Sequence, residues 1–127
     1  MNGRDPMTTR ILIVDDETGS RFMARLFLEE AGFVPDEAGS GVEALERCGT
    51  VDYDVVVLDH RMPGLSGIDV VRELTESDYP GRLLLFTAYQ APELEAEATR
   101  LCVLVVDKAR KETLVEHVRE LAALAPF

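Results

Sequence analysis

The sequence predicts an α/β protein in which a parallel β-sheet is covered by helices on both faces. Short runs of β-branched residues alternate with helical stretches along the whole 127-residue chain, a pattern typical of such a sheet. Five strand–helix units can be counted, and the strands after the second are almost continuously apolar. We therefore predict that these later strands are central and buried.

Each predicted strand is an apolar or β-branched run that stands directly before a helical stretch. The predicted strands span residues 10–14, 33–37, 55–58, 83–86 and 102–106. The helices are expected at about 18–31, from 40, from 66 to before 78, at 93–100 and at about 111–124.

Local signals mark the ends of the first three helices. Gly32 follows the first helix as the residue that ends it in a left-handed conformation. A capping box of Ser40 and Glu43 starts the second helix, and Ser66 with Asp69 starts the third. These helices should therefore begin and end close to the predicted residues.

The last two helices have a start signal and an apolar stripe, respectively. Pro92 suits the first turn of the fourth helix because the missing N–H has no partner there in any case. The fifth helix has a repeating apolar stripe that we expect to be buried, made of Leu114, Val118, Leu121 and Leu124.

The length and the absence of a linker or repeat indicate one domain. We expect residues 10–124 to form it. Residues 1–9 should be disordered or added for expression, and residues 125–127 should form a carboxyl-terminal tail. The chain is then either a stand-alone protein or one domain of a longer one.

Composition excludes several classes of function. The formal net charge of −11 repels phosphate backbones, so we expect no direct nucleic-acid binding. No apolar run approaches the roughly 20 residues of a membrane-spanning helix, and no apolar secretory signal is visible, so we expect a cytoplasmic protein without membrane contact. The two cysteines, Cys48 and Cys102, are far apart and should be reduced, with Cys102 buried in the fifth strand.

Polar residues follow four of the five predicted strands. They are Asp15 and Asp16, Asp59, Thr87, and Lys108. Ligands of doubly wound α/β sheets bind at the carboxyl ends of the strands, and in a flavodoxin-like five-stranded parallel sheet of order 2-1-3-4-5 these four strands are neighbours. The polar residues should therefore share one pocket.

The charges of this pocket predict its ligands. Three close carboxylates repel one another unless a cation joins them, and Mg²⁺ favours one or two carboxylates together with water and a substrate phosphate. Lys108 then offers a cation and Thr87 a hydroxyl donor to a phosphoryl group. Such parts stabilise a phosphoryl group in transfer.

These residues, in this order, resemble the response regulator receiver domains of two-component systems. The resemblance covers residues 10–124 and rests on Ile11 to Glu17, Val55 to Pro63 with Gly67, Phe86 to Ala88, and Val105 to Lys108. It implies a phosphoacceptor switch that takes a phosphoryl group from a sensor histidine kinase or phosphotransfer protein. The phosphorylated domain would act on a downstream effector or a covalently linked output domain. It would be a regulatory domain and not an enzyme.

The resemblance also implies roles for single residues. Asp59 would be the phosphoacceptor, while Asp15, Asp16, Asp59 and the backbone carbonyl of Arg61 would bind Mg²⁺. Thr87 would bind and report the phosphoryl group, and Lys108 would pair with it. Since Val105 stands where the family has a switch aromatic, we predict that Tyr89 takes over the switch role.

Departures from the family pattern leave an alternative open. Ala109 replaces the proline that usually follows the lysine, and Leu101–Cys102 replaces Gly-Ala. A trans bond is expected before Ala109. A pseudo-receiver that binds partners without phosphorylation is the first alternative, and an aspartyl-nucleophile phosphatase of the haloacid dehalogenase type is the second. His60 is expected to be a solvated loop residue.

Overall fold

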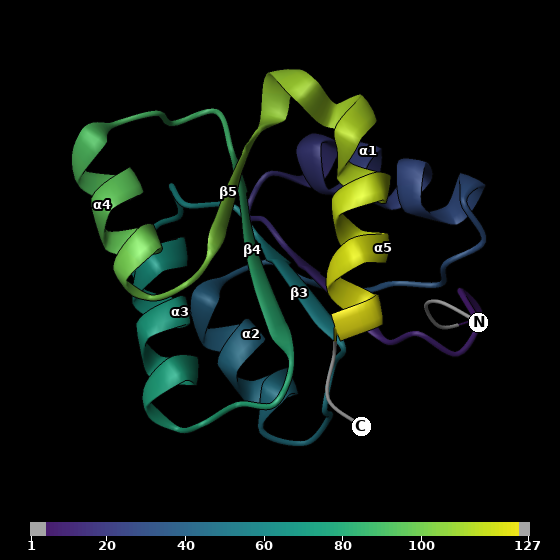
Figure 1. Ribbon diagram of the computed structural model, residues 1–127, viewed down its shortest axis with the longest axis horizontal. Helices are drawn as coiled ribbons and strands as arrows, with labels where there is room; N and C mark the ends of the chain where they lie inside the picture. The colour runs from purple at the N-terminus through teal and green to yellow at the C-terminus, as the bar shows by residue number, and fades with distance from the viewer. Residues whose placement is uncertain (1–4, 125–127) are drawn as a thin grey trace.

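The computed structural model describes residues 5–124 as one five-stranded parallel sheet between two layers of helices (Figure 1). The strand order is β2-β1-β3-β4-β5, with every neighbouring pair parallel. The predicted fold class and strand order are therefore confirmed.

Strands and helices alternate along these residues, and β5 alone is followed by two helical segments in succession. The elements are β1 (Ile11–Val14), α1 (Thr18–Glu30), β2 (Asp36–Ala38), α2 (Gly41–Cys48), β3 (Val55–Leu58), α3 (Gly67–Glu76), β4 (Arg82–Thr87), α4 (Pro92–Arg100), β5 (Leu104–Asp107), the 3₁₀ helix η1 (Lys108–Thr113) and α5 (Leu114–Leu124).

The sheet separates two hydrophobic cores. Alternate residues of a strand point to opposite faces, so Leu12 and Val56 face α2, α3 and α4, whereas Ile13 and Val57 face α1 and α5. Figure 1 shows α1 and α5 together on one side of the sheet and α2, α3 and α4 on the other. The strands β1 and β3 are entirely buried, so their carboxyl ends are fixed from both faces.

The second strand begins three residues later than predicted. The amide of Phe33 donates to the carbonyl of Leu28 at the end of α1 (3.0 Å), and Pro35 has no amide hydrogen to give to a neighbouring strand. Pairing with β1 therefore starts at Asp36, opposite Leu12.

The fifth strand is also shifted, and it is not central. The amides of Cys102 and Val103 close α4 by donating to Thr99 and Ala98, so β5 begins at Leu104. Cys102 is exposed at a φ of 60° and does not lie in the strand, which corrects the prediction of a buried Cys102. Because β5 is an edge strand, Leu104 is 41% exposed despite the apolar sequence.

Helix ends agree with the predicted signals in most cases. Gly32 has a φ of 97° after α1, and Ser66 forms the complete capping box with Asp69. Ser40 caps α2, but the side chain of Glu43 bonds the amide of Gly39 rather than that of Ser40, so this box is incomplete.

The last helix starts later than predicted because residues 108–113 form η1 instead. Of its predicted stripe, Leu114 and Val118 are fully buried, whereas Leu124 is 58% exposed. Leu124 packs poorly because it lies at the end of the helix, and Ala122 is buried in its place.

A hydrogen-bonded turn precedes β1 in the described part of the chain. The amides of Thr8 and Thr9 donate to the carbonyl of Asp5 (3.1 and 3.0 Å), and Thr9 is buried. The other parts of the predicted terminal segments, residues 1–4 and 125–127, lie outside the described residues. Within residues 5–124, none of the helices combines the length and apolar character needed to cross a membrane.

Candidate functional site

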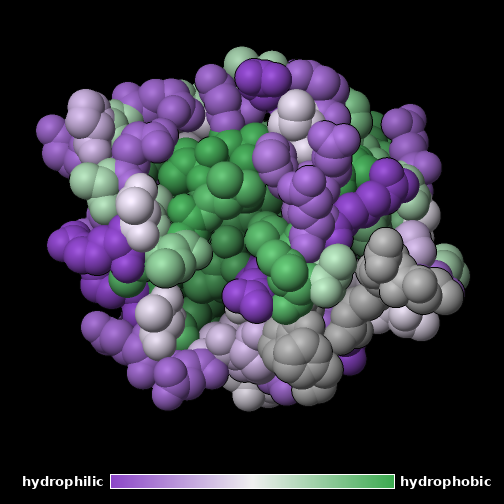
Figure 2. Space-filling view, viewed as in Figure 1, coloured by the Kyte–Doolittle hydropathy of each residue, from purple (hydrophilic) through white to green (hydrophobic). Residues whose placement is uncertain are grey.

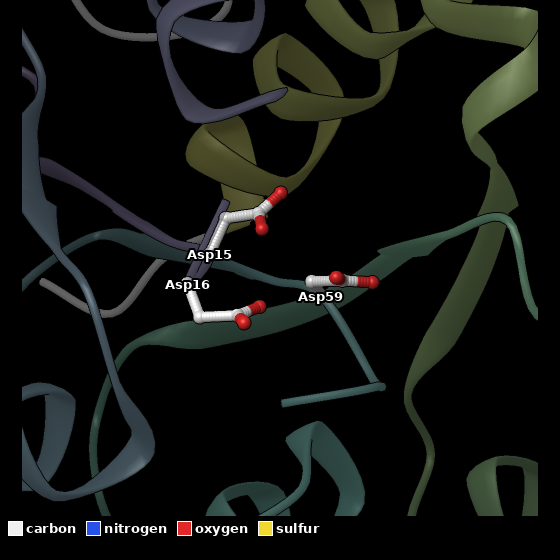
Figure 3. Close-up of side chains that lie close together, drawn as sticks. All are labelled: Asp15, Asp16 and Asp59. Carbon is white, nitrogen blue, oxygen red and sulfur yellow. The ribbon is translucent and has the colours of Figure 1, made fainter. Parts of the chain in front are cut away.

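Three carboxylates meet at the carboxyl edge of the sheet. Asp15 and Asp16 follow β1, and Asp59 follows β3, which pairs with β1 so that Val14 stands opposite Leu58. Figure 3 shows the three side chains side by side, and one ligand oxygen from each lies within 4.8 Å of the others. Oxygen donors at this spacing fit a hard divalent cation such as Mg²⁺.

Asp15 is the most tightly held of the three. It is 4% exposed, and its amide donates to the carbonyl of Ala38 (3.1 Å). Its Oδ1 accepts from the amide of Glu17 (3.0 Å), and its Oδ2 accepts from Nζ of Lys108 (2.7 Å). Both oxygens of Asp15 therefore have protein partners, whereas the Asp16 side chain is exposed.

Asp59 is fixed by its own backbone and by the residue that follows it. Its amide donates to the carbonyl of Val14 (2.9 Å), and its Oδ1 accepts from the amide of His60 (2.8 Å). Its Oδ2 lies 3.5 Å from Nζ of Lys108. One carboxylate oxygen is thus oriented by the chain, and the other faces the lysine.

The amine of Lys108 is surrounded by three oxygens from distant parts of the chain. Besides Asp15 and Asp59, the Oγ atom of Ser20 lies 2.6 Å away. Sequence reasoning missed Ser20, because a serine in the first turn of a helix has no pattern that marks it as part of a site.

Lys108 is the first residue of η1, and its backbone is held by a cap. The side chain of Asp107 accepts a hydrogen bond from the amide of Ala109 (2.9 Å). Proline at position 109 could not donate this bond. No cis peptide bond occurs among the described residues, so the bond between Lys108 and Ala109 is trans, as expected.

Thr87 ends β4 and is 1% exposed. Its Oγ1 accepts a hydrogen bond from the amide of Tyr89 (3.1 Å). A hydroxyl that accepts in this way can still donate its own hydrogen. Thr87 is therefore bonded directly to the loop that carries Tyr89.

Tyr89 lies in a stack with two residues of the loop after Asp59. Its ring lies 5.4 Å from that of His60 and 3.8 Å from the guanidinium carbon of Arg61. His60 is not the solvated residue that was predicted. It is half-buried, its Nδ1 accepts from the amide of Ile68 (3.4 Å), and burial lowers the pKa of its imidazole.

Five of the predicted site residues, Asp59, Arg61, Thr87, Tyr89 and Lys108, line one open cleft of about 500 Å³, while Asp15 and Asp16 lie beside Asp59. Its walls include Glu17, Ser20, Asp59, Arg61, Thr87, Tyr89 and Lys108. Val105 does not belong to this cleft. It lies on β5 beside a second depression of about 300 Å³, together with Leu104 and His117.

Comparison with known proteins gives a consistent result. Residues 11–119 match the response regulator receiver domain family. The chemotaxis protein CheY of Thermotoga maritima is 33% identical over 119 residues, which cover 91% of this chain and 99% of that protein. The transcriptional regulatory protein ResD of Bacillus subtilis is 43% identical over 68 residues, or 54% of this chain, but the match spans only 28% of ResD.

A solved structure with a similar fold is the response regulator TrrA of Thermotoga maritima in complex with Mg²⁺–BeF. The TM-score is 0.80 and the sequence identity is 34%, with 90% of this chain and 99% of that chain covered.

Proposed function

The chain belongs to the response regulator receiver domain family, and from this premise we propose that it is a Mg²⁺-dependent phosphorylation switch whose phosphoacceptor is Asp59. Receiver domains of this family are regulatory signalling domains. We propose that residues 10–124 form the receiver, and that it works in the cytoplasm with a sensor histidine kinase or a phosphotransfer protein as its phosphodonor.

One observation carries the proposal: an acid, a cation and a hydroxyl face the same cleft in the arrangement that phosphoryl transfer requires. Asp59, Lys108 and Thr87 all line it, and Nζ of Lys108 lies 3.5 Å from Oδ2 of Asp59. Transfer of a phosphoryl group depends mainly on positioning and on stabilising its spread negative charge. A cation and a hydroxyl donor beside the nucleophile supply both.

The donor set fits Mg²⁺. The clustered oxygens of Asp15, Asp16 and Asp59 are hard ligands, and no histidine or cysteine belongs to this cluster among the described residues, which disfavours zinc. Asp16 and Asp59 would bind the ion directly, and Asp15 through water, together with the carbonyl of Arg61. When bound, Mg²⁺ supplies positive charge to the phosphoryl oxygens. The TrrA structure with Mg²⁺–BeF supports this assignment.

The chain's own residues have separate tasks in the transfer. A carboxylate oxygen of Asp59 attacks phosphorus, and the bond from phosphorus to the donor's nitrogen or oxygen breaks with its electron pair leaving on the donor. Lys108 pairs with one phosphoryl oxygen, and Thr87 donates its hydroxyl hydrogen to another. The amide of His60 keeps Oδ1 of Asp59 oriented throughout (2.8 Å).

The output surface is proposed to include α4 and β5. Figure 2 shows hydrophobic residues gathered on the face where β5 runs between α4 and α5, surrounded by hydrophilic ones. Leu104 on β5 is 41% exposed. A shift of the Thr87 loop after phosphorylation would change this surface for an effector or a linked output domain. The net charge of −11 disfavours nucleic acid as a direct partner of the domain.

The two alternatives are less well supported. A pseudo-receiver has no need of an intact site, yet Asp15, Asp16, Asp59, Thr87 and Lys108 all converge here. A haloacid dehalogenase phosphatase would need an acid two residues after the nucleophile, where Arg61 stands.

The test is phosphorylation by a small phosphodonor, followed by mass spectrometry of the intact protein. We expect one added phosphoryl group in the presence of Mg²⁺ and none in excess chelator, because uncompensated carboxylates repel an incoming phosphate. Asp59→Asn should remove the signal, whereas the control Asp52→Asn, at an exposed acid after α2, should retain it. Undiminished labelling of Asp59→Asn or of the chelated protein contradicts the assignment.

A further inference from the structure

The tip of Lys108 is bound more closely by α1 than by the phosphoacceptor. Its Nζ lies 2.6 Å from Oγ of Ser20 and 2.7 Å from Oδ2 of Asp15, but 3.5 Å from Oδ2 of Asp59. The first two are short hydrogen-bonded contacts, whereas the third is beyond the usual hydrogen-bond range. A lysine ammonium has three N–H donors, so two are occupied and one remains to meet a new acceptor.

We propose that Ser20 is a positioning residue of the phosphoryl-transfer site, whose hydroxyl oxygen holds the Lys108 ammonium between Asp15 and Asp59. The inference rests on the proposed function and adds a residue to it. Ser20 does not touch the phosphoryl group, so its effect passes through Lys108.

A neutral acceptor at this position has a clear advantage over the other side chains that could stand there. Lysine has a flexible four-carbon chain, and its compact charge is drawn toward any carboxylate. With an apolar residue at position 20, the ammonium would interact only with Asp15 and Asp59, the carboxylates that are proposed to bind the metal. A carboxylate at this position would bind it more firmly and would also add charge that repels phosphate. A hydroxyl orients the amine without either effect.

The hydroxyl is itself held in place by the start of α1. The neighbouring side chain, Arg21, donates from Nη1 to the carbonyl of Asp15 (2.6 Å) and from Nε to Glu37 (2.7 Å). Farther along, Ala24 and Leu28 anchor α1 in the core. The first turn of α1 is therefore tied to the same loop that carries Asp15, so Ser20 and Asp15 approach the lysine as one unit.

The base of the lysine is fixed independently of its tip. The Asp107 side chain accepts from the amide of Ala109 (2.9 Å) and so sets the backbone at the start of η1. This fixes where the side chain of Lys108 leaves the backbone, while Ser20, 88 positions away in sequence, fixes where it ends. Both ends of the side chain are thereby defined in a chain that lacks proline at position 109.

The experiment uses the full chain with Mg²⁺ and two probes: acetyl phosphate for the phosphorylation rate and beryllofluoride for affinity. For Ser20→Ala we expect both the rate and the beryllofluoride affinity to fall about five- to tenfold, the effect of losing one hydrogen bond of ordinary net strength. The variants Ser20→Thr and Ser20→Val have side chains of the same shape, but only threonine keeps the hydroxyl, so their comparison isolates the effect of the hydroxyl group. Threonine should restore at least half of the wild-type values, and valine should behave like alanine.

A double-mutant cycle with Lys108→Met distinguishes positioning from a general structural role. If Ser20 acts through the lysine, Ser20→Ala causes no further loss of rate or affinity once Lys108 has been replaced. Equal losses in both backgrounds, or equal values for the threonine and valine variants, would overturn the role of Ser20 while the proposed function stands. A wild-type chain that accepts neither phosphoryl group nor beryllofluoride would overturn the proposed function itself.

Discussion

The guanidinium carbon of Arg61 lies 3.8 Å from the centre of the Tyr89 ring, which itself stacks on His60 at 5.4 Å. Arg61 and Tyr89 come from the loops after β3 and β4, and both line the cleft beside Asp59. A cation placed over an aromatic face is held there by the ring quadrupole. The two side chains therefore form a cover on one side of the proposed phosphoacceptor.

We predict that this cover prolongs the life of the acyl phosphate, since it hinders water from reaching the attack position opposite the Asp59 oxygen. Replacing both residues in Arg61→Ser/Tyr89→Ala should accelerate loss of the phosphoryl group by on the order of tenfold. The measurement is the decay of phosphorylated mass after the donor is removed. Arg110→Ala removes the same charge outside the cleft and serves as the control. Equal decay in the double variant and the wild type contradicts the idea.

A second prediction concerns how the signal leaves the site. Thr87 is bonded directly to the amide of Tyr89 (3.1 Å), whereas Val105 lies on β5 outside the cleft. Valine has few rotamers and no polar tip, so we expect Tyr89 to carry the switch. Differential contacts of a few kcal/mol suffice to invert a two-state population.

The comparison of Tyr89→Ala with Val105→Ala tests this prediction. The readout is the set of chemical shift changes that phosphorylation causes in α4 and β5, followed by NMR. Tyr89→Ala should remove most of that response, and Val105→Ala should leave it. The opposite pattern would assign the switch to Val105.

Gly67 is predicted to be required for the geometry of the loop after β3 that carries Asp59. A Cβ atom at this position would meet the carbonyl oxygen of Asp59 at 2.3 Å and Cα of His60 at 2.9 Å. Gly67→Ala should therefore lower the free energy of unfolding by about 1–3 kcal/mol and slow phosphorylation as well. Urea unfolding and the acetyl phosphate assay measure the two effects.

Gly19 provides the matched control for that substitution. It lies in the first turn of α1, and a Cβ atom there meets nothing within 4 Å. Gly19→Ala should be neutral or raise the free energy of unfolding by up to about 1 kcal/mol. Similar stability for the two alanine variants would show that the backbone around position 67 can shift to admit a Cβ atom with little loss in the free energy of unfolding.

Stability should decline at alkaline pH because of Tyr53. Burial and the hydrogen bond to Asp36 raise the pKa of the Tyr53 hydroxyl to about 12. The folded state thus keeps a proton that the unfolded state begins to lose near pH 10. The free energy of unfolding should be at its full value below that pH and should fall by on the order of 2 kcal/mol up to about pH 12.

Denaturant unfolding across this pH range measures the effect, with Tyr53→Phe as the comparison. Phenylalanine should lower stability by about 1 kcal/mol at neutral pH through loss of the bond to Asp36, and its pH dependence should be shallower. Burial also raises the pKa of Tyr79, so we attribute to Tyr79 any dependence of the unfolding free energy on pH that remains in Tyr53→Phe. Parallel pH profiles for wild type and Tyr53→Phe would contradict this role.

The sequence was sufficient for the fold class, the strand order and the residues that gather at the carboxyl edge. The fold class and the clustered residues depend on patterns that one chain displays by itself, namely apolar runs, capping residues and polar residues directly after strands, whereas the strand order was taken from the flavodoxin-like arrangement. Asp15, Asp59 and Lys108 were predictable because each immediately follows or ends such a run.

Other features depend on contacts that no local pattern encodes. The strand shifts at Phe33 and Val103 arise because their amides close the preceding helices. Ser20 enters the site through its contact with Lys108 of η1, and His60 is covered by contacts with Tyr89 and Ile68. Each is the product of tertiary packing between segments far apart in sequence.

The ion pair between Asp15 and Lys108 joins residues 93 positions apart. Asp15 follows the first strand and Lys108 follows the last, so a chain still emerging from the ribosome has one without the other. Contacts of such long sequence separation are slow to form, because the entropy of closing the intervening loop must be lost first. Under the proposed function, a fragment that ends before β5 lacks Lys108 and would not accept a phosphoryl group, so phosphorylation would require that the whole sheet has been synthesised and folded.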